Sequence, residues 1–477
     1  MLENLQNELQ KRLSEQIEWL LVRSSGRNFA LQNSEIELQF GSNKVLFGFL
    51  DDKGFQTWRI TACELEDDEV VLKLSRDFGR ETEKIRLVPR VSARELGENV
   101  ELARLEKANQ IAAIIKENFP RINFIRVELN KENGRFAQML FENPNGSQIA
   151  VLADVSDVLT PEIILSSAIL WLTKLENRRK NFVEIVWIIC EKKAARNTQK
   201  LHALLKDNWK KKILIKEISR QGAKAQSIDK SPEENSLIEL SSLEIKELWR
   251  TKTNEIKPIE YAQMGETAAE IIKLAPEEID AIFSKHGETL RFQGLPFARV
   301  RKIFDEEQIW FGIERSRQIL TENNRKDLLE LVENLKIYRR FDSPNKRHAF
   351  YSLAPESWLE ALLRKNIKLL DANLVLSPLY HQFRAGRDKI DLLALRKDGR
   401  LVIIEIKVAP DREMIFQAAD YWRKIELQRR KGNLKKARIF GDIEIADKPA
   451  IVYLVAPTLS FHRDFEFLAD TISSEIK

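Results

Sequence analysis

Residues 390–408 read IDLLALRKDGRLVIIEIKV, two apolar runs joined by a short polar segment. A continuous apolar run of this length is typical of a strand that is covered on both faces. The Asp398-Gly399 pair is a strong signal for a tight turn. We therefore predict a buried β-hairpin. Glu405 and Lys407 interrupt its second strand and share one face, because strand side chains alternate.

The length of the hairpin loop decides which side chain lies opposite Glu405. A two-residue loop would pair Asp391 with Ile406 and turn it away, because a one-residue slip in register exchanges the faces. A three-residue loop at 397–399, with Gly399 left-handed, places Asp391 directly across from Glu405. We predict the three-residue loop.

Two buried charges on one strand need compensation, since burying an ion costs several kcal/mol without a partner, a metal or an open cleft. An aspartate and a glutamate at adjacent strand positions can hold one or two Mg²⁺ or Mn²⁺ ions and leave coordination sites for water and phosphate. The nearby Lys407 can orient or deprotonate the attacking water and offset charge on the phosphorane. This set of residues fits phosphodiester hydrolysis.

Residues 355–477 resemble the PD-(D/E)XK nuclease superfamily, through Asp391 and the Glu405-Ile406-Lys407 triplet. The helix that follows carries a Q-x-x-x-Y element, and the helix before the hairpin supplies an acidic residue. The resemblance implies these catalytic residues: Asp391, Glu405, Lys407, Gln417, Tyr421 and Glu360. It implies these metal ligands: Asp391, Glu405, Ile406 and Glu360. Asp388 competes with Asp391 for this role, and Glu356 with Glu360.

Two basic segments are candidates for contacts with phosphates. The first follows Tyr421 and contains Arg423, Lys424, Arg429, Arg430, Lys435 and Lys436. The second, YRRFDSPNKRHAFYSL at 338–353, reads as a β-hairpin wing that carries Arg339 and Arg340. The alternative in both cases is a solvated basic surface without a ligand.

An earlier part of the chain repeats the plan of the nuclease-like segment. Residues 135–155 align without gaps on the hairpin that ends at Val408, and we infer a divergent internal duplication. The alternative is that any strand-hairpin-strand-helix unit looks alike at this level. In the first copy, Gln138 stands at the position of Asp391 and Leu152 at that of Glu405. Asp154 stands at the position of Lys407 and Ser166 at that of Gln417. The first copy is therefore predicted to be catalytically dead and retained for binding, dimer-like packing or scaffolding.

The expected fold class is a multidomain mixture of α/β and α+β parts. Residues 1–100 should form a helix at 2–22 followed by a β-rich domain, and 101–218 a degenerate nuclease-like α/β domain. Residues 219–236 read as a linker and 237–354 as a helical, winged-helix-like domain. Residues 355–477 should form the nuclease domain with a mixed sheet.

The composition is that of a soluble globular chain, with 43% hydrophobic residues and a net charge of only +5. Cys63 and Cys190 are isolated and predict neither a disulfide framework nor a zinc site. The first residues do not form a secretory signal and no apolar run is long enough to span a bilayer, so we expect a cytoplasmic protein without a membrane partner.

Together these features predict a Mg²⁺- or Mn²⁺-dependent nuclease that acts on DNA, in repair or defence. The alternatives are a non-catalytic nucleic-acid-binding scaffold and an RNA-directed nuclease. The degenerate copy offers a surface for a homodimer or a protein partner.

Overall fold

The computed structural model describes the chain from Leu2 to Lys477 with several gaps. The gaps are residues 17, 24–27, 33–34, 42–43, 52–53, 66–68, 77–80, 90–92, 157–158, 178–182, 222–233, 254–263, 285–286, 304–305, 314–315, 377–389 and 458–459. The chain divides into two compact units, Met1–His202 with Asn208–Ser242, and Ala203–Asp207 with Leu243–Lys477. None of the described helices is long and apolar enough to cross a membrane.

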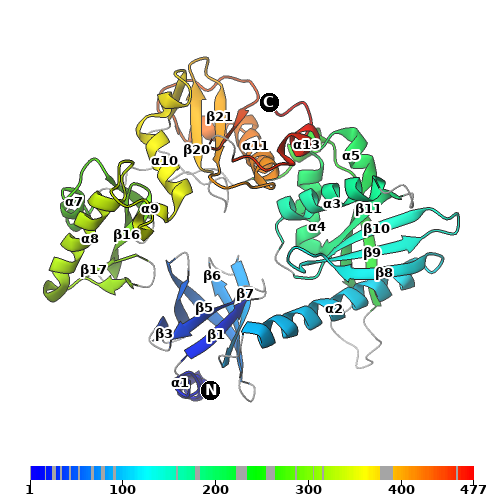
Figure 1. Cartoon of the computed structure of the whole chain (residues 1–477), viewed down its shortest axis with the longest axis horizontal. Coiled ribbons are helices and arrows are strands. Elements are labelled where there is room, and N and C mark those ends of the chain that lie inside the picture. Colours follow the sequence, from blue (N-terminus) through cyan, green and yellow to red (C-terminus); the bar gives the residue numbers. More distant parts are fainter. Residues whose placement is uncertain are drawn as a thin grey trace. The chain divides into compact units, whose positions relative to one another are not determined.

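The first unit begins with a helix and an antiparallel sheet of seven strands in the order β2-β1-β7-β6-β5-β4-β3 (Figure 1). The helix is shorter than predicted, because α1 ends at Ser14 and the apolar Trp19 and Leu21 are buried in a strand. The Trp19 indole donates a hydrogen bond to the Leu13 carbonyl, which ties this strand to the helix. The elements are α1 (Leu2–Ser14), β1 (Glu18–Arg23), β2 (Asn28–Gln32), β3 (Ile36–Gly41), β4 (Lys44–Asp51), β5 (Gly54–Leu65), β6 (Val70–Arg76) and β7 (Glu81–Pro89).

The remainder of the first unit is an α/β part with a six-stranded mixed sheet, ordered β13-β12-β11-β10-β9-β8. Strands β8, β9 and β10 are antiparallel neighbours, and β10 pairs with β11 in parallel. The predicted linker is partly strand, since β12 and β13 pair in this sheet on either side of residues 222–233. The elements are α2 (Ala93–Asn118), β8 (Asn123–Leu129), β9 (Phe136–Glu142), β10 (Gln148–Asp154), α3 (Pro161–Glu176), β11 (Val183–Glu191), α4 (Lys192–His202), α5 (Asp207–Lys212), β12 (Ile213–Gln221) and β13 (Glu234–Leu240).

The second unit opens with a five-stranded antiparallel sheet, which we call the middle sheet. One face of the middle sheet packs against Leu328, Val332 and Leu335 of α8. The prediction of a mainly helical, winged-helix-like domain is therefore wrong about the dominant element. The elements are α6 (Ile245–Leu248), α7 (Glu266–Ile272), β14 (Ile279–Ser284), β15 (Gly287–Phe292), β16 (Leu295–Ile303), β17 (Glu306–Phe311), β18 (Gln318–Ile319), η4 (Glu322–Asn324), α8 (Arg325–Tyr338) and α9 (Ala349–Ser352).

The predicted hairpin wing at 338–353 is also wrong, because these residues form turns followed by helix α9. The Arg339 side chain lies inside the domain, at 0% exposure, and donates to five backbone carbonyls. These carbonyls belong to Phe292, Gln293, Phe350, Leu353 and Ala354. Arg339 therefore joins the middle sheet to the segment that precedes the C-terminal domain, and its donors are directed to the backbone inside the protein.

The C-terminal part has a four-stranded mixed sheet in the order β19-β20-β21-β22. Neighbours are antiparallel except for β21 and β22, which are parallel. Helix α11 packs against β21 and β22, and the Trp422 indole donates to the Ala450 carbonyl at 3.0 Å. The elements are α10 (Pro355–Lys365), η5 (Ile367–Leu369), β19 (Leu374–Leu376), β20 (Leu392–Arg396), β21 (Leu401–Ile406), α11 (Met414–Arg430), α12 (Asn433–Lys436), β22 (Ile451–Val455) and α13 (Phe465–Asp470).

The β20–β21 hairpin has the predicted three-residue loop. The Arg396 amide donates to the Arg400 carbonyl at 2.8 Å, and Gly399 has a φ of +77°. Residues facing each other across this hairpin include Leu392 with Ile404, so the same register sets Asp391 across from Glu405. The prediction about the register is confirmed.

The first copy contains the same hairpin. The Asn143 amide donates to the Ser147 carbonyl at 2.8 Å, and Gly146 has a φ of +83°. Gln138 pairs with Leu152, the positions that correspond to Asp391 and Glu405. Strand order and direction also agree from β8 to β11 and from β19 to β22. The shared loop, register and topology support the inferred duplication.

A buried histidine in the first unit predicts a pH-dependent stability. His202 is 3% exposed, and burial lowers the pKa of its imidazole from 6.5 to about 4. Below pH 6.5 the unfolded chain binds a proton at this residue that the folded chain does not bind. Stability is therefore full above pH 6.5 and falls by about 3 kcal/mol as the pH drops to 4. Urea unfolding at pH 7.5 and 4.5 should show this loss, and His202→Gln should reduce it.

The matched control is His462→Gln, since His462 is a half-buried histidine in the second unit. The control should keep the pH dependence of the wild-type chain. An equal pH dependence in His202→Gln and wild type would show that His202 does not titrate differently in the folded state.

Candidate active site

Two carboxylates lie side by side where β20 and β21 meet. Asp391 immediately precedes β20, and its Oδ2 accepts a hydrogen bond from the Ile406 amide at 2.9 Å. This bond turns the Asp391 carboxylate toward the strand that bears Glu405. The Ile406 side chain is apolar, so only its backbone could serve as the predicted ligand.

Glu405 is a buried acid, and only one of its two carboxylate oxygens has a partner among the described residues. Its side chain is 3% exposed, and one carboxylate oxygen, Oε1, lies 3.1 Å from Lys407 Nζ. The other oxygen, Oε2, is buried and has no hydrogen-bond donor among the described residues. Burial raises the pKa of Glu405 to about 8, with a further contribution from the Asp391 charge, while Lys407 opposes the rise. A buried oxygen in this state requires a proton or a cation.

Lys407 is held among acids. Burial lowers the pKa of its ammonium, but the charge and hydrogen bond of Glu405, together with the charges of Glu356 and Asp411, outweigh burial and the net shift is upward. Lys407 is therefore protonated at neutral pH. In this form it can stabilise negative charge on a phosphate.

Asp411 is a site residue that the sequence reading missed. Its Oδ2 lies 4.0 Å from Lys407 Nζ, and its Oδ1 accepts from the amides of Glu413 and Met414 at the start of α11. An aspartate just before a helix is a familiar capping signal, which could have located this residue. Asp411 links the position of α11 to the Lys407 side chain.

Gln417 and Tyr421 both lie on α11, the helix that packs on β21. Gln417 Oε1 is buried and lacks a hydrogen-bond donor within the described part of the chain. Tyr421 is half-buried, with Lys424 Nζ 5.7 Å from the centre of its ring. Gln417 Oε1 is thus, like Glu405 Oε2 and Glu360 Oε1, a buried oxygen of this domain without a hydrogen-bond donor among the described residues.

Glu360 does not join the two carboxylates and is engaged elsewhere. It is 3% exposed, and its Oε1 lies 3.7 Å from both Arg291 and Arg364. Glu356 is instead the acid of α10 whose charge raises the pKa of Lys407. The structure therefore favours Glu356 over Glu360 as the acidic residue on this helix. The alternative ligand Asp388 lies outside the described residues.

The residues present fit a divalent cation held by few protein ligands. Across the described ranges, no three or more His, Cys, Asp or Glu side chains gather into a metal cluster. Mg²⁺ commonly takes only one or two carboxylates and fills its other positions with water and substrate phosphate. The unsatisfied oxygen of Glu405 beside Asp391 matches that requirement.

All four of the predicted phosphate-binding residues on α11 form ion pairs within the protein. Arg423 and Lys424 both pair with Asp420 at 2.6 Å. Arg429 is 8% exposed and pairs with Glu426 at 2.8 Å, and with Asp447. These contacts assign Arg429 a structural role at the end of α11.

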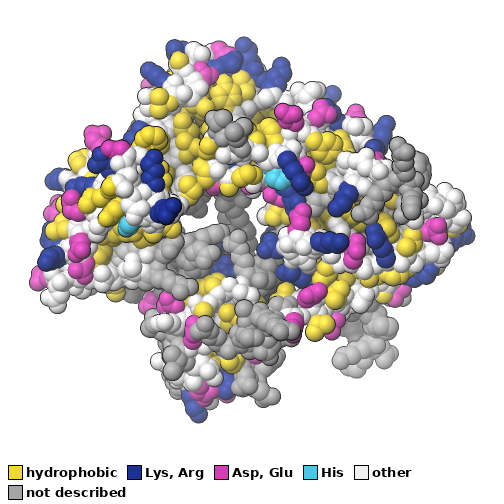
Figure 2. Space-filling model, viewed as in Figure 1, with side chains coloured by type: hydrophobic (Ala, Val, Ile, Leu, Met, Phe, Trp, Pro, Cys, Tyr) yellow, Lys and Arg dark blue, Asp and Glu magenta, His cyan; other side chains and the backbone are white. Residues whose placement is uncertain are grey.

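The other predicted basic residues are more accessible. Arg430 is 39% exposed and lies 4.7 Å from the ring centre of Trp249. Lys435 is 76% exposed, 3.9 Å from Glu444. Lys436 is exposed, and Arg340 is 51% exposed and paired with Asp342. On the face drawn in Figure 2, Lys and Arg side chains are interspersed with acidic and hydrophobic ones.

The corresponding position in the first copy has no carboxylate pair. Leu152 and Gln138 face each other there, and neither carries a charge. Asp154 is 6% exposed, and its Oδ1 accepts from the Ser156 amide and hydroxyl at 2.8 and 3.0 Å. The first copy therefore keeps the backbone of the site without its chemistry.

Comparisons with known proteins give only distant likenesses. No protein-family model and no curated protein match the chain. EndoMS in its apo form is 12% identical, with a TM-score of 0.16 over 40% of this chain and 85% of that chain. An EndoMS–dsDNA complex is 15% identical, with a TM-score of 0.17 over 40% and 84% of the two chains.

A repair endonuclease from Pyrococcus abyssi is 10% identical, with a TM-score of 0.14 over 39% and 84% of the two chains. Scores this low carry no argument about function. The functional conclusion therefore depends on the residues of the site.

Proposed function

We propose that this chain is a divalent-metal-dependent nuclease that hydrolyses phosphodiester bonds in DNA. The observation that carries the proposal is the buried, unsatisfied Oε2 of Glu405, with Asp391 across the strand pair. The other carboxylate oxygen, Oε1, lies 3.1 Å from Lys407 Nζ. A cation at this position would satisfy the oxygen. A purely structural role offers no reason to bury an acid with one unsatisfied oxygen on the central hairpin.

Each residue has a distinct role in the proposed reaction. Asp391 and Glu405 would hold Mg²⁺ or Mn²⁺, which when bound activates water and stabilises the leaving oxygen. Lys407, held protonated by its acidic neighbours, offsets charge on the phosphorane. Gln417 and Tyr421 orient groups from the α11 side. Glu356 and Asp411 position the Lys407 ammonium.

Replacing Lys407 with Ala should lower the rate of cleavage by about a hundredfold, because the cation that offsets phosphorane charge is lost. The assay uses labelled single-stranded, duplex and branched DNA, with Mg²⁺, Mn²⁺ or EDTA. Lys397→Ala is the matched control, because Lys397 is exposed in the hairpin loop of the same domain. It should cleave at the wild-type rate.

Cleavage that persists in EDTA would overturn the metal dependence. Faster cleavage of RNA of the same sequence would identify RNA as the substrate. Binding of DNA by a wild-type chain that cuts none of these substrates would contradict the proposal and support the non-catalytic scaffold.

A further inference from the structure

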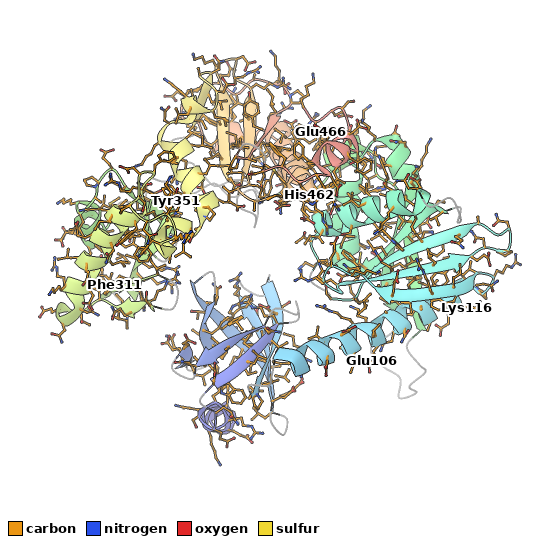
Figure 3. All side chains as sticks on the ribbon, viewed as in Figure 1. Glu106, Lys116, Phe311, Tyr351, His462 and Glu466 are labelled. Atoms are coloured by element: carbon orange, nitrogen blue, oxygen red, sulfur yellow. The ribbon has the colours of Figure 1, made fainter. Side chains whose placement is uncertain are left out.

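One face of the middle sheet does not contribute to the hydrophobic core of this part. Leu290, Val300 and Phe311 point to the side covered by α8 and belong to its hydrophobic core. Phe311, labelled in Figure 3, is 2% exposed on that side. Strand alternation then places Arg299 and Arg301 of β16 together on the opposite face, the outer face of the sheet.

The register adds further residues to this outer face. Arg299 pairs with Thr289 on one neighbouring strand and with Trp310 on the other. Arg301 pairs with Gln308. The outer face is therefore built from arginine, tryptophan and neutral polar side chains at its centre, in contrast with the apolar core face.

Arg299 and Arg301 are cations that have no acidic partner among the described residues. Within the part of the chain that the structure describes, neither forms an ion pair, and Arg301 Nε is buried without a hydrogen-bond acceptor. Burial lowers the pKa of Arg299 to about 10, with further lowering by the charges of Arg301 and Arg317. Such crowding of positive charge is unfavourable in the free protein and is relieved by an anion.

Helix α10 connects the middle sheet with the candidate active site. Arg291, two positions along β15 from Thr289, pairs with Asp280, which also pairs with Arg364 of α10 at 3.1 Å. The first turn of the same helix carries Glu356, whose charge raises the pKa of Lys407. One helix thus contacts both the arginine-bearing sheet and the surroundings of the carboxylates.

We propose that the outer face of the middle sheet binds the phosphate backbone of the DNA substrate, through Arg299 and Arg301. This inference rests on the proposed function for its choice of DNA as the polyanion. Arginine donors suit phosphate oxygens, and contacts to the backbone alone carry no base preference. The middle sheet then supplies the affinity that the paired residues of α11 do not provide.

The test compares two double variants of the full chain with equal loss of charge. Arg299→Gln with Arg301→Gln removes the proposed contacts. Arg325→Gln with Lys326→Gln is the matched control, because both residues are exposed on α8. Binding of a fluorescein-labelled DNA duplex and of its single strand is measured by anisotropy in EDTA, from 50 to 300 mM NaCl.

The first variant should bind DNA on the order of tenfold more weakly at 100 mM salt, and the slope of log affinity against log salt should fall by about two. The control should retain the wild-type slope. Arg299→Lys with Arg301→Lys should restore most of the binding, because it restores both charges.

Equal salt slopes in the two Gln variants would overturn the inference, whatever the outcome of the cleavage assays. Because binding is read in EDTA, loss of cleavage in the wild-type chain would contradict the proposed function without affecting this result. Thermal unfolding checks that each variant is folded. If the double Gln variant is unfolded, Arg301→Gln alone should lower the slope by about one, and an unchanged slope would again overturn the inference.

Discussion

Replacing Glu405 with Gln lowers metal-dependent cleavage by roughly a thousandfold, the largest effect expected of any single substitution. The change keeps the volume of the side chain but replaces the charged carboxylate with a neutral amide, which has one oxygen ligand instead of two and no negative charge to hold the cation. A catalytic metal stabilises the transition state by several kcal/mol, and about 4 kcal/mol corresponds to roughly three orders of magnitude in rate. Single-turnover cleavage with Mg²⁺ and Mn²⁺ measures the loss.

The control for this variant is Glu444→Gln, which removes one acid that is 84% exposed in the same unit. It should cleave like the wild type, and both variants should bind DNA in EDTA with wild-type affinity. Wild-type cleavage by a Glu405→Gln preparation free of contaminating nuclease would exclude Glu405 from catalysis.

Replacing Arg339 with Leu should destabilise the second unit by about 3–5 kcal/mol. The substitution leaves five buried backbone carbonyls without their donor, and each unsatisfied polar group costs free energy. It also removes the contact of the guanidinium with the Trp358 ring, whose centre lies 5.0 Å away. Urea unfolding followed by circular dichroism measures the effect.

The neighbouring residue provides the control. Arg340 is 51% exposed and pairs with Asp342 on the surface, so Arg340→Leu should change the free energy of unfolding by less than about 0.5 kcal/mol. Equal unfolding midpoints for the two variants would show that the Arg339 contacts contribute little to stability.

The central hairpin could be predicted because its determinants are local. Gly399 permits the left-handed turn residue, and the apolar runs on both sides fix which residues lie opposite one another. The register of Asp391 and Glu405 follows from these few residues. The contact of Glu360 with Arg291 could not be found in this way, since Arg291 lies in a different sheet and is distant in sequence. Its other partner, Arg364, follows it by four residues on the same helix.

The segment 338–353 shows the limit of pattern reading. Aromatic and basic residues around a turn are typical of a hairpin wing, and nothing local distinguishes a solvated arginine from a buried one. Arg339 is buried because two backbone segments that are distant from each other in sequence, 292–293 and 350–354, present carbonyls to it, an arrangement that exists only in the folded domain. On α11, by contrast, Asp420 and Glu426 stand three residues before Arg423 and Arg429, so their ion pairs were visible at helical spacing.

The matching hairpins bear on the history of the chain. Asn143 to Ser147 and Arg396 to Arg400 close the same loop, although only the second lies beside acidic residues. The first copy has this loop but lacks the carboxylates, so selection for catalysis does not explain why the loop is retained there. Its retention is better explained by folding, because a short-range turn forms early at little entropic cost. On the inferred duplication, the two units therefore differ in the side chains that they place on a shared backbone.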